Sequence, residues 1–199
     1  MATVHSQKTP VMVGQTDVAV TEDTTHVHPA ARYVWGALRI VVGFTFLWAF
    51  FDKLLALGYG TGVDSETGVT DRFGDAAWIH GGSPTNGFLA YGADGPFKGF
   101  YNALAGTTFA DWMFMAALFG IGIAFTFGAF TRLAAGAGAL LYLMMWSVAL
   151  PPENNPLFDE HIIGALVCLL LGFYAAGRYL GIGTWWEKQG IVRRFPILK

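Results

Sequence analysis

Charged residues are scarce in this chain of 199 residues: they make up 13% of it, whereas hydrophobic residues make up 54%. A soluble domain of this length carries about a quarter charged residues. The charge is missing mainly from four stretches, each about as long as a bilayer-spanning helix of roughly 20 residues. The composition therefore predicts one integral membrane domain and no separate soluble catalytic domain.

Cysteine and suitably placed histidine are nearly absent as well. Cys168 is the single cysteine, which excludes an internal disulfide and a CxxC redox pair, and we interpret it as a packing residue. Only His161 lies near an apolar stretch, whereas a bis-histidine haem needs two histidines at membrane depth. No glycine-rich nucleotide loop and no metal-ligand spacing occurs. We expect no haem, flavin or metal, and the net charge of −2 predicts no nucleic-acid partner.

Four apolar stretches predict an all-α fold, an integral membrane four-helix bundle. They cover about residues 33–57, 112–130, 133–150 and 162–180. Only Thr131 and Arg132 separate the second stretch from the third, which predicts a tight antiparallel hairpin. Pro151 and Pro152 follow the third and end its helix, because proline cannot donate the next helical hydrogen bond.

Basic residues gather on one side of such a bundle. They are Lys8, Arg32, Arg132, Arg178, Lys188, Arg193, Arg194 and Lys199. The other side has Arg72 and Lys98 among nine acidic residues of the connecting loops. By the positive-inside rule the basic side faces the cytoplasm. We therefore expect a multi-pass protein of the bacterial cell membrane with both termini in the cytoplasm, and the polar first residues show no cleavable signal peptide.

Three parts follow from this layout: a cytoplasmic tail (1–31), a membrane domain (32–183) and a basic, aromatic tail (184–199) that either lies in the membrane interface or docks on a partner subunit. A long outer loop, residues 58–111, interrupts the membrane domain. Apolar residues at helical spacing in this loop predict a short interfacial helix. They are Phe97, Phe100, Tyr101 and Leu104. The loop is either a plug packed over the bundle or a lid that controls access to it.

Small residues spaced by four predict where the helices pack, because they let backbones approach closely within lipid. The fourth stretch carries Gly164, Cys168, Gly172 and Ala176, and the second carries Gly120, Ala124 and Gly128. We interpret both stripes as helix–helix seams.

Ionisable side chains inside a membrane are costly and suggest function. Asp52 and Lys53 lie at the outer end of the first stretch, and the run Asp159-Glu160-His161 opens the fourth. If these two helices adjoin, five titratable groups meet and could relay protons to a bound quinone, with histidine best suited to exchange them near neutral pH. The alternative is that the acidic pair caps a helix and complements its dipole.

The catalytic candidates are therefore His161, Lys53 and Asp52. The candidates for holding a quinone are Arg39, Glu160 and Tyr142. Arg39 lies about two turns inside the first stretch, where it either snorkels to the cytoplasmic surface or binds another helix, a cofactor headgroup or a lipid phosphate. Tyr142 offers aromatic surface that equally suits the core.

Several short motifs occur in order along these stretches. Arg39, Gly43, Phe46 and Lys53 form the pattern R-x3-G-x2-F-x6-K, residues 96–101 read Pro-Phe-Lys-Gly-Phe-Tyr, and His161 precedes a Gly-Arg-Tyr-Leu-Gly run at 177–181. This order, over about residues 32–187, resembles the DoxX/DoxD group of small bacterial membrane proteins. That family often has an Asp where this chain has Gly183.

The resemblance implies a membrane subunit of a thiosulfate:quinone oxidoreductase, which works with a second subunit, DoxA, and binds a diffusible quinone. Our first hypothesis is such a quinone-linked subunit with its site near the outer face. The second is a non-catalytic accessory subunit of a larger respiratory-chain complex, since the chain lacks ligands for an electron carrier. A transporter is a weaker third hypothesis, because no broken helix pair or inverted repeat is present.

Overall fold

A computed structural model describes residues 29–64, 66–152, 155 and 157–199. These residues form helices joined by turns and contain no strand, which confirms the predicted all-α class. The expected tail 1–31 lies almost wholly outside the described residues.

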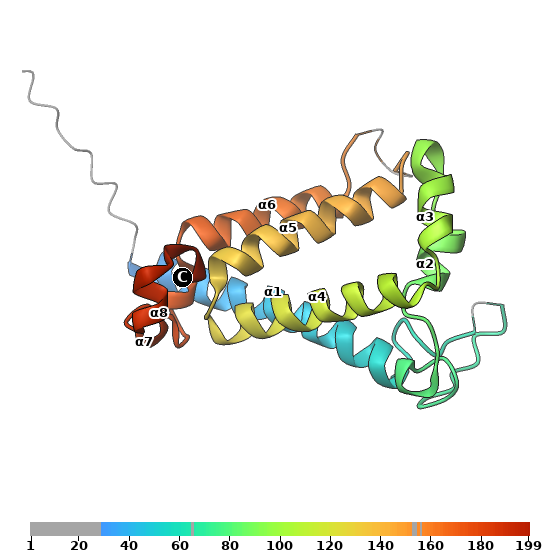
Figure 1. Cartoon of the computed structure of the whole chain (residues 1–199), viewed down its shortest axis with the longest axis horizontal. Coiled ribbons are helices and arrows are strands. Elements are labelled where there is room, and N and C mark those ends of the chain that lie inside the picture. The colour runs from blue at the N-terminus through green and yellow to red at the C-terminus, as the bar shows by residue number, and fades with distance from the viewer. Residues whose placement is uncertain (1–28, 65, 153–154, 156) are drawn as a thin grey trace, which may run out of the picture.

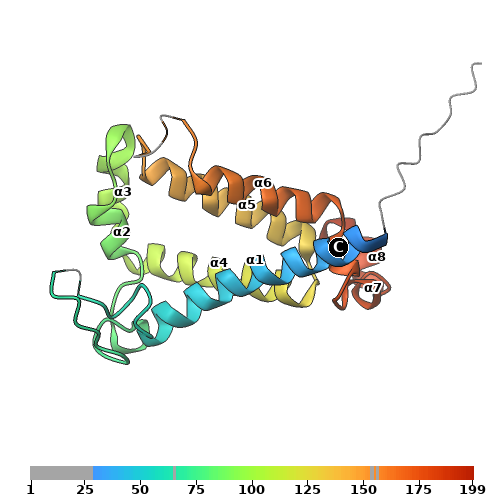
Figure 2. The same ribbon diagram turned by 180° about the vertical axis from the view of Figure 1, so that it is seen from behind.

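Four helices make up the body of the molecule (Figure 1). They are α1 (Pro29–Leu55), α4 (Thr108–Phe127), α5 (Thr131–Val148) and α6 (Glu160–Phe173). α1 packs mainly on α4, and α5 mainly on α6, so the helices form two pairs. The pairs lie close at the end that holds Arg39 and spread apart toward the end that holds α2 and α3 (Figures 1 and 2). We name these the Arg39 end and the loop end.

Two of the four helices, α1 and α4, are long and apolar enough to cross a membrane. α6 is apolar but has only 14 residues. The sequence predicted a helix as far as residue 180, and this boundary was wrong. The chain leaves the helix after Phe173, because Ala175 adopts a left-handed backbone with φ of 47° and a short 3-10 turn follows.

The predicted hairpin between the second and third stretches is confirmed. α4 ends at Phe127 and α5 begins at Thr131. Gly128, with φ of 80°, supplies the left-handed turn, and its N–H donates to the carbonyl of Ala124. Glycine adopts this conformation at little cost.

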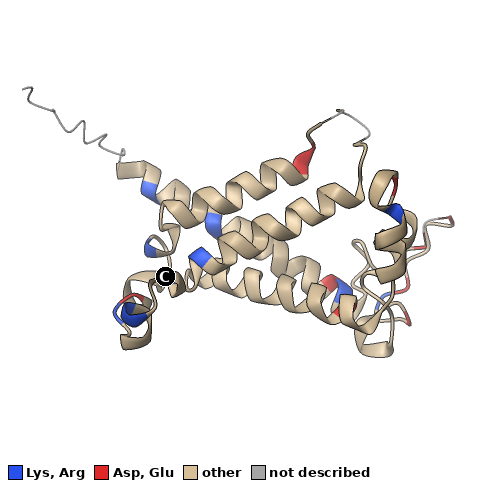
Figure 3. Ribbon diagram, turned by 45° about the horizontal axis from the view of Figure 1, so that its top comes forward, with Lys and Arg blue, Asp and Glu red and all other residues tan. Residues whose placement is uncertain are grey.

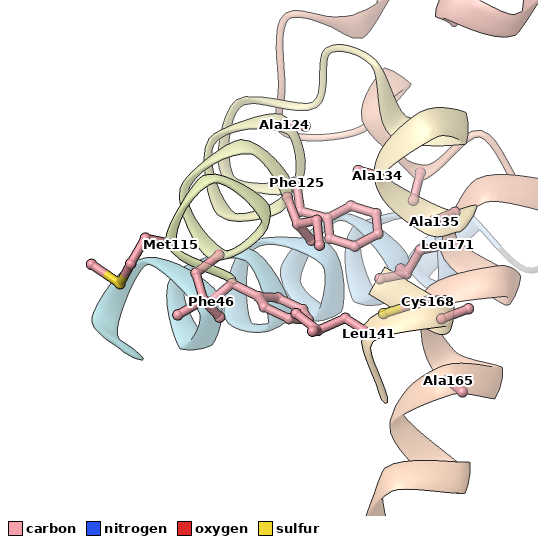
Figure 4. Packing of buried hydrophobic residues seen from close by; sticks show 14 residues of the cluster. Phe46, Met115, Ala124, Phe125, Ala134, Ala135, Leu141, Ala165, Cys168 and Leu171 are labelled. Atoms are coloured by element: carbon pink, nitrogen blue, oxygen red, sulfur yellow. The ribbon is translucent and has the colours of Figure 1, made fainter. Parts of the chain in front are cut away.

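The small-residue stripe of α6 is the seam with α5, as predicted. A Cβ on Gly164 would meet the Tyr142 ring at 2.7 Å, and one on Gly172 would meet the Ala135 Cβ at 2.5 Å. Cys168 is fully buried between them. Phe125 of α4 points toward Ala134, Ala135 and Leu171 (Figure 4). Phe46 of α1 belongs to the same buried cluster, so the core joins all four helices.

The predicted α4 stripe is wrong at Gly120, where an added Cβ would meet nothing within 4 Å. The seam with α1 uses Gly122 instead, where a Cβ would lie 2.8 Å from the Leu47 side chain. Gly43 of α1 completes it, because a Cβ there would lie 2.5 Å from the Thr126 nitrogen. Gly122, two positions after Gly120, is therefore the residue that faces α1.

The connection between α1 and α4 carries four short helical turns at the loop end. They are η1 (Trp78–His80), α2 (Asn86–Tyr91), η2 (Gly95–Phe97) and α3 (Lys98–Leu104). α3 is the helix predicted in this loop. Its Tyr101 packs with Val148 of α5 and shares a hydrogen bond with Ser147, whereas Phe97 and Phe100 are exposed. One side of α3 therefore rests on the end of α5.

The segment after α6 folds against the Arg39 end. It contains η3 (Ala176–Arg178), α7 (Gly183–Trp186), α8 (Gly190–Arg194) and η4 (Pro196–Leu198). Trp186 contacts Phe130 in a tilted arrangement with ring centroids 4.4 Å apart, and its indole donates to the carbonyl of Leu198. The backbone N–H of Arg132 donates to the carbonyl of Lys199. This tail is therefore packed onto the start of α5.

Candidate functional site

Arg39 is fully buried at the centre of the Arg39 end. Its guanidinium has five N–H groups, and all five donate to backbone carbonyls. The acceptors are the oxygens of Phe125, Thr126 (3.0 Å), Ala176 (3.2 Å), Tyr179 (3.2 Å) and Leu180 (2.9 Å). Arg39 does not snorkel, and no donor of its side chain is left for a cofactor or a lipid phosphate.

These acceptors explain why an arginine belongs there. The carbonyls of Phe125 and Thr126 lie in the last turn of α4, where an α-helix offers them no partner of its own. The carbonyls of Ala176, Tyr179 and Leu180 lie in and beyond the turn that replaces the end of α6. Burial without a partner costs such a group about 1–3 kcal/mol. One side chain therefore satisfies the ends of two helices.

Glycines let the backbones close around Arg39. A Cβ on Gly181 would lie 2.8 Å from the Arg39 guanidinium, and one on Gly177 would lie 2.4 Å from the Gly128 oxygen. Gly183 is buried, and its Cβ would lie 2.4 Å from the Gly177 oxygen. The backbone of Gly177 therefore occupies the room that an aspartate side chain at this position would need.

Asp52 and Lys53 lie at the last turn of α1, at the loop end. Asp52 is buried, and its carboxylate accepts hydrogen bonds from the backbone N–H groups of Tyr59 (3.1 Å) and Gly60 (3.0 Å). It thereby fixes the first turn of the loop. Lys53 is half-buried and makes no ion pair within 4 Å among the described residues. Of the two, only Lys53 keeps its polar atom free.

Asp159 and His161 form a close pair at the start of α6. The Asp159 carboxylate accepts from the backbone N–H groups of His161 and Ile162, which makes it the helix cap, and lies 2.7 Å from Nδ1 of His161. Burial raises the pKa of Asp159, but the hydrogen bond and charge of His161 and the two backbone N–H groups outweigh it, so the pKa is lowered.

The His161 ring is next to an aromatic pair. Its centroid lies 6.3 Å from that of Tyr142, which in turn meets Phe46 of α1 edge-on at 5.4 Å. Glu160, which lies between Asp159 and His161 in the sequence, is exposed. The structure therefore brings His161, Asp159 and Tyr142 together and leaves Glu160 at the surface.

The five titratable groups of the sequence hypothesis do not form one cluster. Asp52 and Lys53 end α1 in one helix pair, whereas Asp159, Glu160 and His161 begin α6 in the other, and the pairs spread apart at this end (Figure 2). No hydrogen bond or ion pair among the described residues links the two groups.

Sequence reasoning missed two polar contacts that hold the connections at the loop end. The buried Asp111 in the first turn of α4 accepts from the hydroxyls of Ser83 (2.8 Å) and Thr85 (2.6 Å). Trp146 donates from its indole to the carbonyl of Leu157 at 3.1 Å. The position of Asp111 directly before an apolar stretch was the available signal, but its partners lie 26 and 28 residues away.

No group of three or more histidine, cysteine or acidic side chains that could hold a metal occurs in the part of the chain that the structure describes. Comparison of the chain with protein families, curated proteins and solved structures finds no match.

Proposed function

We propose that this chain is a four-span membrane protein whose Arg39 end faces the cytoplasm. All four long helices expose large apolar side chains along their lengths, which a soluble monomer rarely does over a continuous surface. They include Val41, Phe44, Met113, Phe119, Leu140, Leu143, Ile163 and Leu166. Figure 3 shows Lys, Arg, Asp and Glu mostly toward the two ends of these helices. Arg39 lies further inside α1 but is fully buried, so it does not face the lipid. The lipid tails would cover this belt.

The shortness of α6 is compatible with a span. Its 14 residues extend about 21 Å, less than the roughly 30 Å of a bilayer core. Irregular backbone is tolerated at membrane depth only where protein surrounds it and satisfies its polar groups. The segment 174–180 meets this condition, because Arg39 binds three of its carbonyls and Ala176 and Gly177 are buried.

Within the membrane we propose a non-catalytic accessory role in a larger respiratory-chain complex, as the resemblance to DoxX/DoxD proteins allows. One observation carries this choice: three of the charged side chains that the sequence offers for chemistry bind the protein's own backbone. Arg39 has used its five donors, Asp52 binds two amides, and Asp159 caps α6. Exposed aromatic residues of the loop end, such as Tyr91 and Phe100, supply a surface for a partner subunit.

The test is purification of the tagged chain from its own membranes in mild detergent, followed by mass spectrometry of associated proteins and extracted quinone. We expect respiratory-chain subunits at a fixed ratio, and loss of them from the double variant Tyr91→Ser, Phe100→Ser. Phe109→Ser, which also removes an exposed aromatic residue but on α4, is the matched control. A chain that purifies alone with stoichiometric quinone would contradict the accessory role.

The Asp159–His161–Tyr142 group favours a second candidate, the quinone-linked oxidoreductase subunit. One ring nitrogen of His161 faces a carboxylate, and its other nitrogen has no hydrogen-bond partner among the described residues. Such a pair can pass a proton to a bound quinone carbonyl. This candidate predicts that His161→Ala and Lys53→Met abolish thiosulfate-dependent quinone reduction in a protein that still assembles. Unchanged turnover in the folded double variant would rule it out.

A further inference from the structure

An apolar groove runs along the outside of α4 and α5 toward the Arg39 end. Its volume is about 540 Å³. Gly120 leaves its floor open, because nothing lies within 4 Å of an added Cβ. Phe127, Phe130, Leu133 and Ile182 line the part nearest the tail.

The groove is long and lined only by apolar residues. Its α4 wall runs from Ala116 to Phe127, 11 helical steps of about 1.5 Å or roughly 16 Å. Alanine, glycine, phenylalanine, isoleucine and leucine make up its whole lining. Its occupant is therefore apolar along this length.

Positive charge gathers at the end of the molecule where the groove meets the tail. Phe130, in the groove wall, contacts the Trp186 ring of the tail, and Arg132 immediately precedes Leu133 of the lining. Among the described residues of this end, Glu187 is the sole acidic side chain, and Arg178 already binds it with N–O distances of 2.8–3.0 Å. Basic side chains there that lack an acidic partner are Arg32, Arg132, Lys188, Arg193, Arg194 and Lys199.

We propose that this groove binds one acyl chain of an anionic phospholipid, with its phosphate held at the basic tail near Arg132 and Lys188. The inference rests on the proposed membrane location. The apolar groove matches the acyl chain of such a lipid, and the basic residues without an acidic partner match its anionic headgroup. Lysine and arginine beside an anionic headgroup each contribute about fivefold in affinity.

The experiment is native mass spectrometry of the full chain in detergent, with dioleoyl phosphatidylglycerol or dioleoyl phosphatidylcholine added in turn. We expect one phosphatidylglycerol to bind in preference to phosphatidylcholine. Gly120→Leu fills the groove and should abolish the bound lipid. Gly136→Leu is the matched control, because it places the same side chain on α5, also with nothing within 4 Å of its Cβ, outside the groove.

A second pair of variants tests the headgroup. Arg132→Gln with Lys188→Gln should lower the preference for phosphatidylglycerol by roughly 25-fold, at about fivefold for each charge. Lys98→Gln at the loop end should leave it unchanged. Equal binding of both lipids by the native chain, full binding by Gly120→Leu, or a stoichiometric protein in the groove in place of lipid would each overturn the proposal. Release of the chain from membranes by carbonate would instead contradict the proposed membrane role.

Discussion

Replacing Arg39 by methionine should unfold the Arg39 end more readily than any other change of one charged residue. Methionine keeps most of the side-chain volume but donates no hydrogen bond. Five carbonyls then lose their partner, and two of these bonds, to Phe125 and Ala176, are fully buried. At about 1–3 kcal/mol for each buried unpaired acceptor, the free energy of unfolding should fall by about 2–6 kcal/mol.

The assay is thermal unfolding of the detergent-purified chain, followed by tryptophan fluorescence. A loss of this size corresponds to a Tm lowered by roughly 5–20 °C for a chain of this length. Arg132→Met is the control, because Arg132 is exposed and its side chain makes a single hydrogen bond, to Pro196. An Arg39→Met protein as stable as this control would refute the structural role of Arg39. If Arg39→Met lost bound quinone with no change in Tm, the structural role would also be refuted, because that result would mean that Arg39 binds the quinone headgroup.

Three other predictions concern glycine positions and the cap of α6, and all use the same unfolding assay. Gly183→Asp should lower the free energy of unfolding by about 1–3 kcal/mol, because its Cβ would lie 2.4 Å from the Gly177 oxygen; an unchanged Tm would contradict this. Gly120→Ala should raise the free energy of unfolding by up to about 1 kcal/mol, because the added Cβ meets nothing. Gly172→Ala should lower it, because its Cβ would lie 2.5 Å from the Ala135 Cβ. Equal effects of the two variants would contradict the seam between α5 and α6. Because the folded pKa of Asp159 is lowered, its charge stabilises the fold above pH about 4, and this contribution is lost as the pH falls through the folded pKa. The Tm of Asp159→Asn should therefore approach that of the native chain below pH 4, and a constant difference would refute the cap's charge dependence.

The sequence predicted the helices well where apolar residues run on without interruption. α1, α4 and α5 follow the expected stretches, and the hairpin is confirmed, but Thr131 and Arg132, predicted as its link, begin α5, and residues 128–130 make the turn. The stripe around Cys168 also predicted a helix–helix seam, because one helix face of small residues admits a close neighbour, and the structure shows that this neighbour is α5. The lengths of the apolar runs and the spacing of the small residues thus predict the helices and one of their packing faces directly.

The partners of the polar residues could not be predicted in the same way. Arg39 binds carbonyls 86–141 residues away, and any residue type supplies a carbonyl, so no sequence pattern marks the acceptors. The end of α6 was missed for a related reason. The residues 174–180 are as apolar as a helix would require, but the left-handed Ala175 and the donors of Arg39 make the turn possible. Tertiary contacts outweigh local propensity there.

The measurement that tests the four-span account most directly is labelling of single cysteines in intact cells with a membrane-impermeant maleimide. Native Cys168 is fully buried and should stay unlabelled. We would place one cysteine at each of four exposed positions. Gly99 and Leu157 lie in the two connections at the loop end, Arg132 lies in the first turn of α5, and Gly190 lies in the segment after α6. The account predicts labelling from outside at 99 and 157, and only after permeabilisation at 132 and 190. Residue 157 on the same side as 132 would contradict it, because α5 would then not cross the membrane.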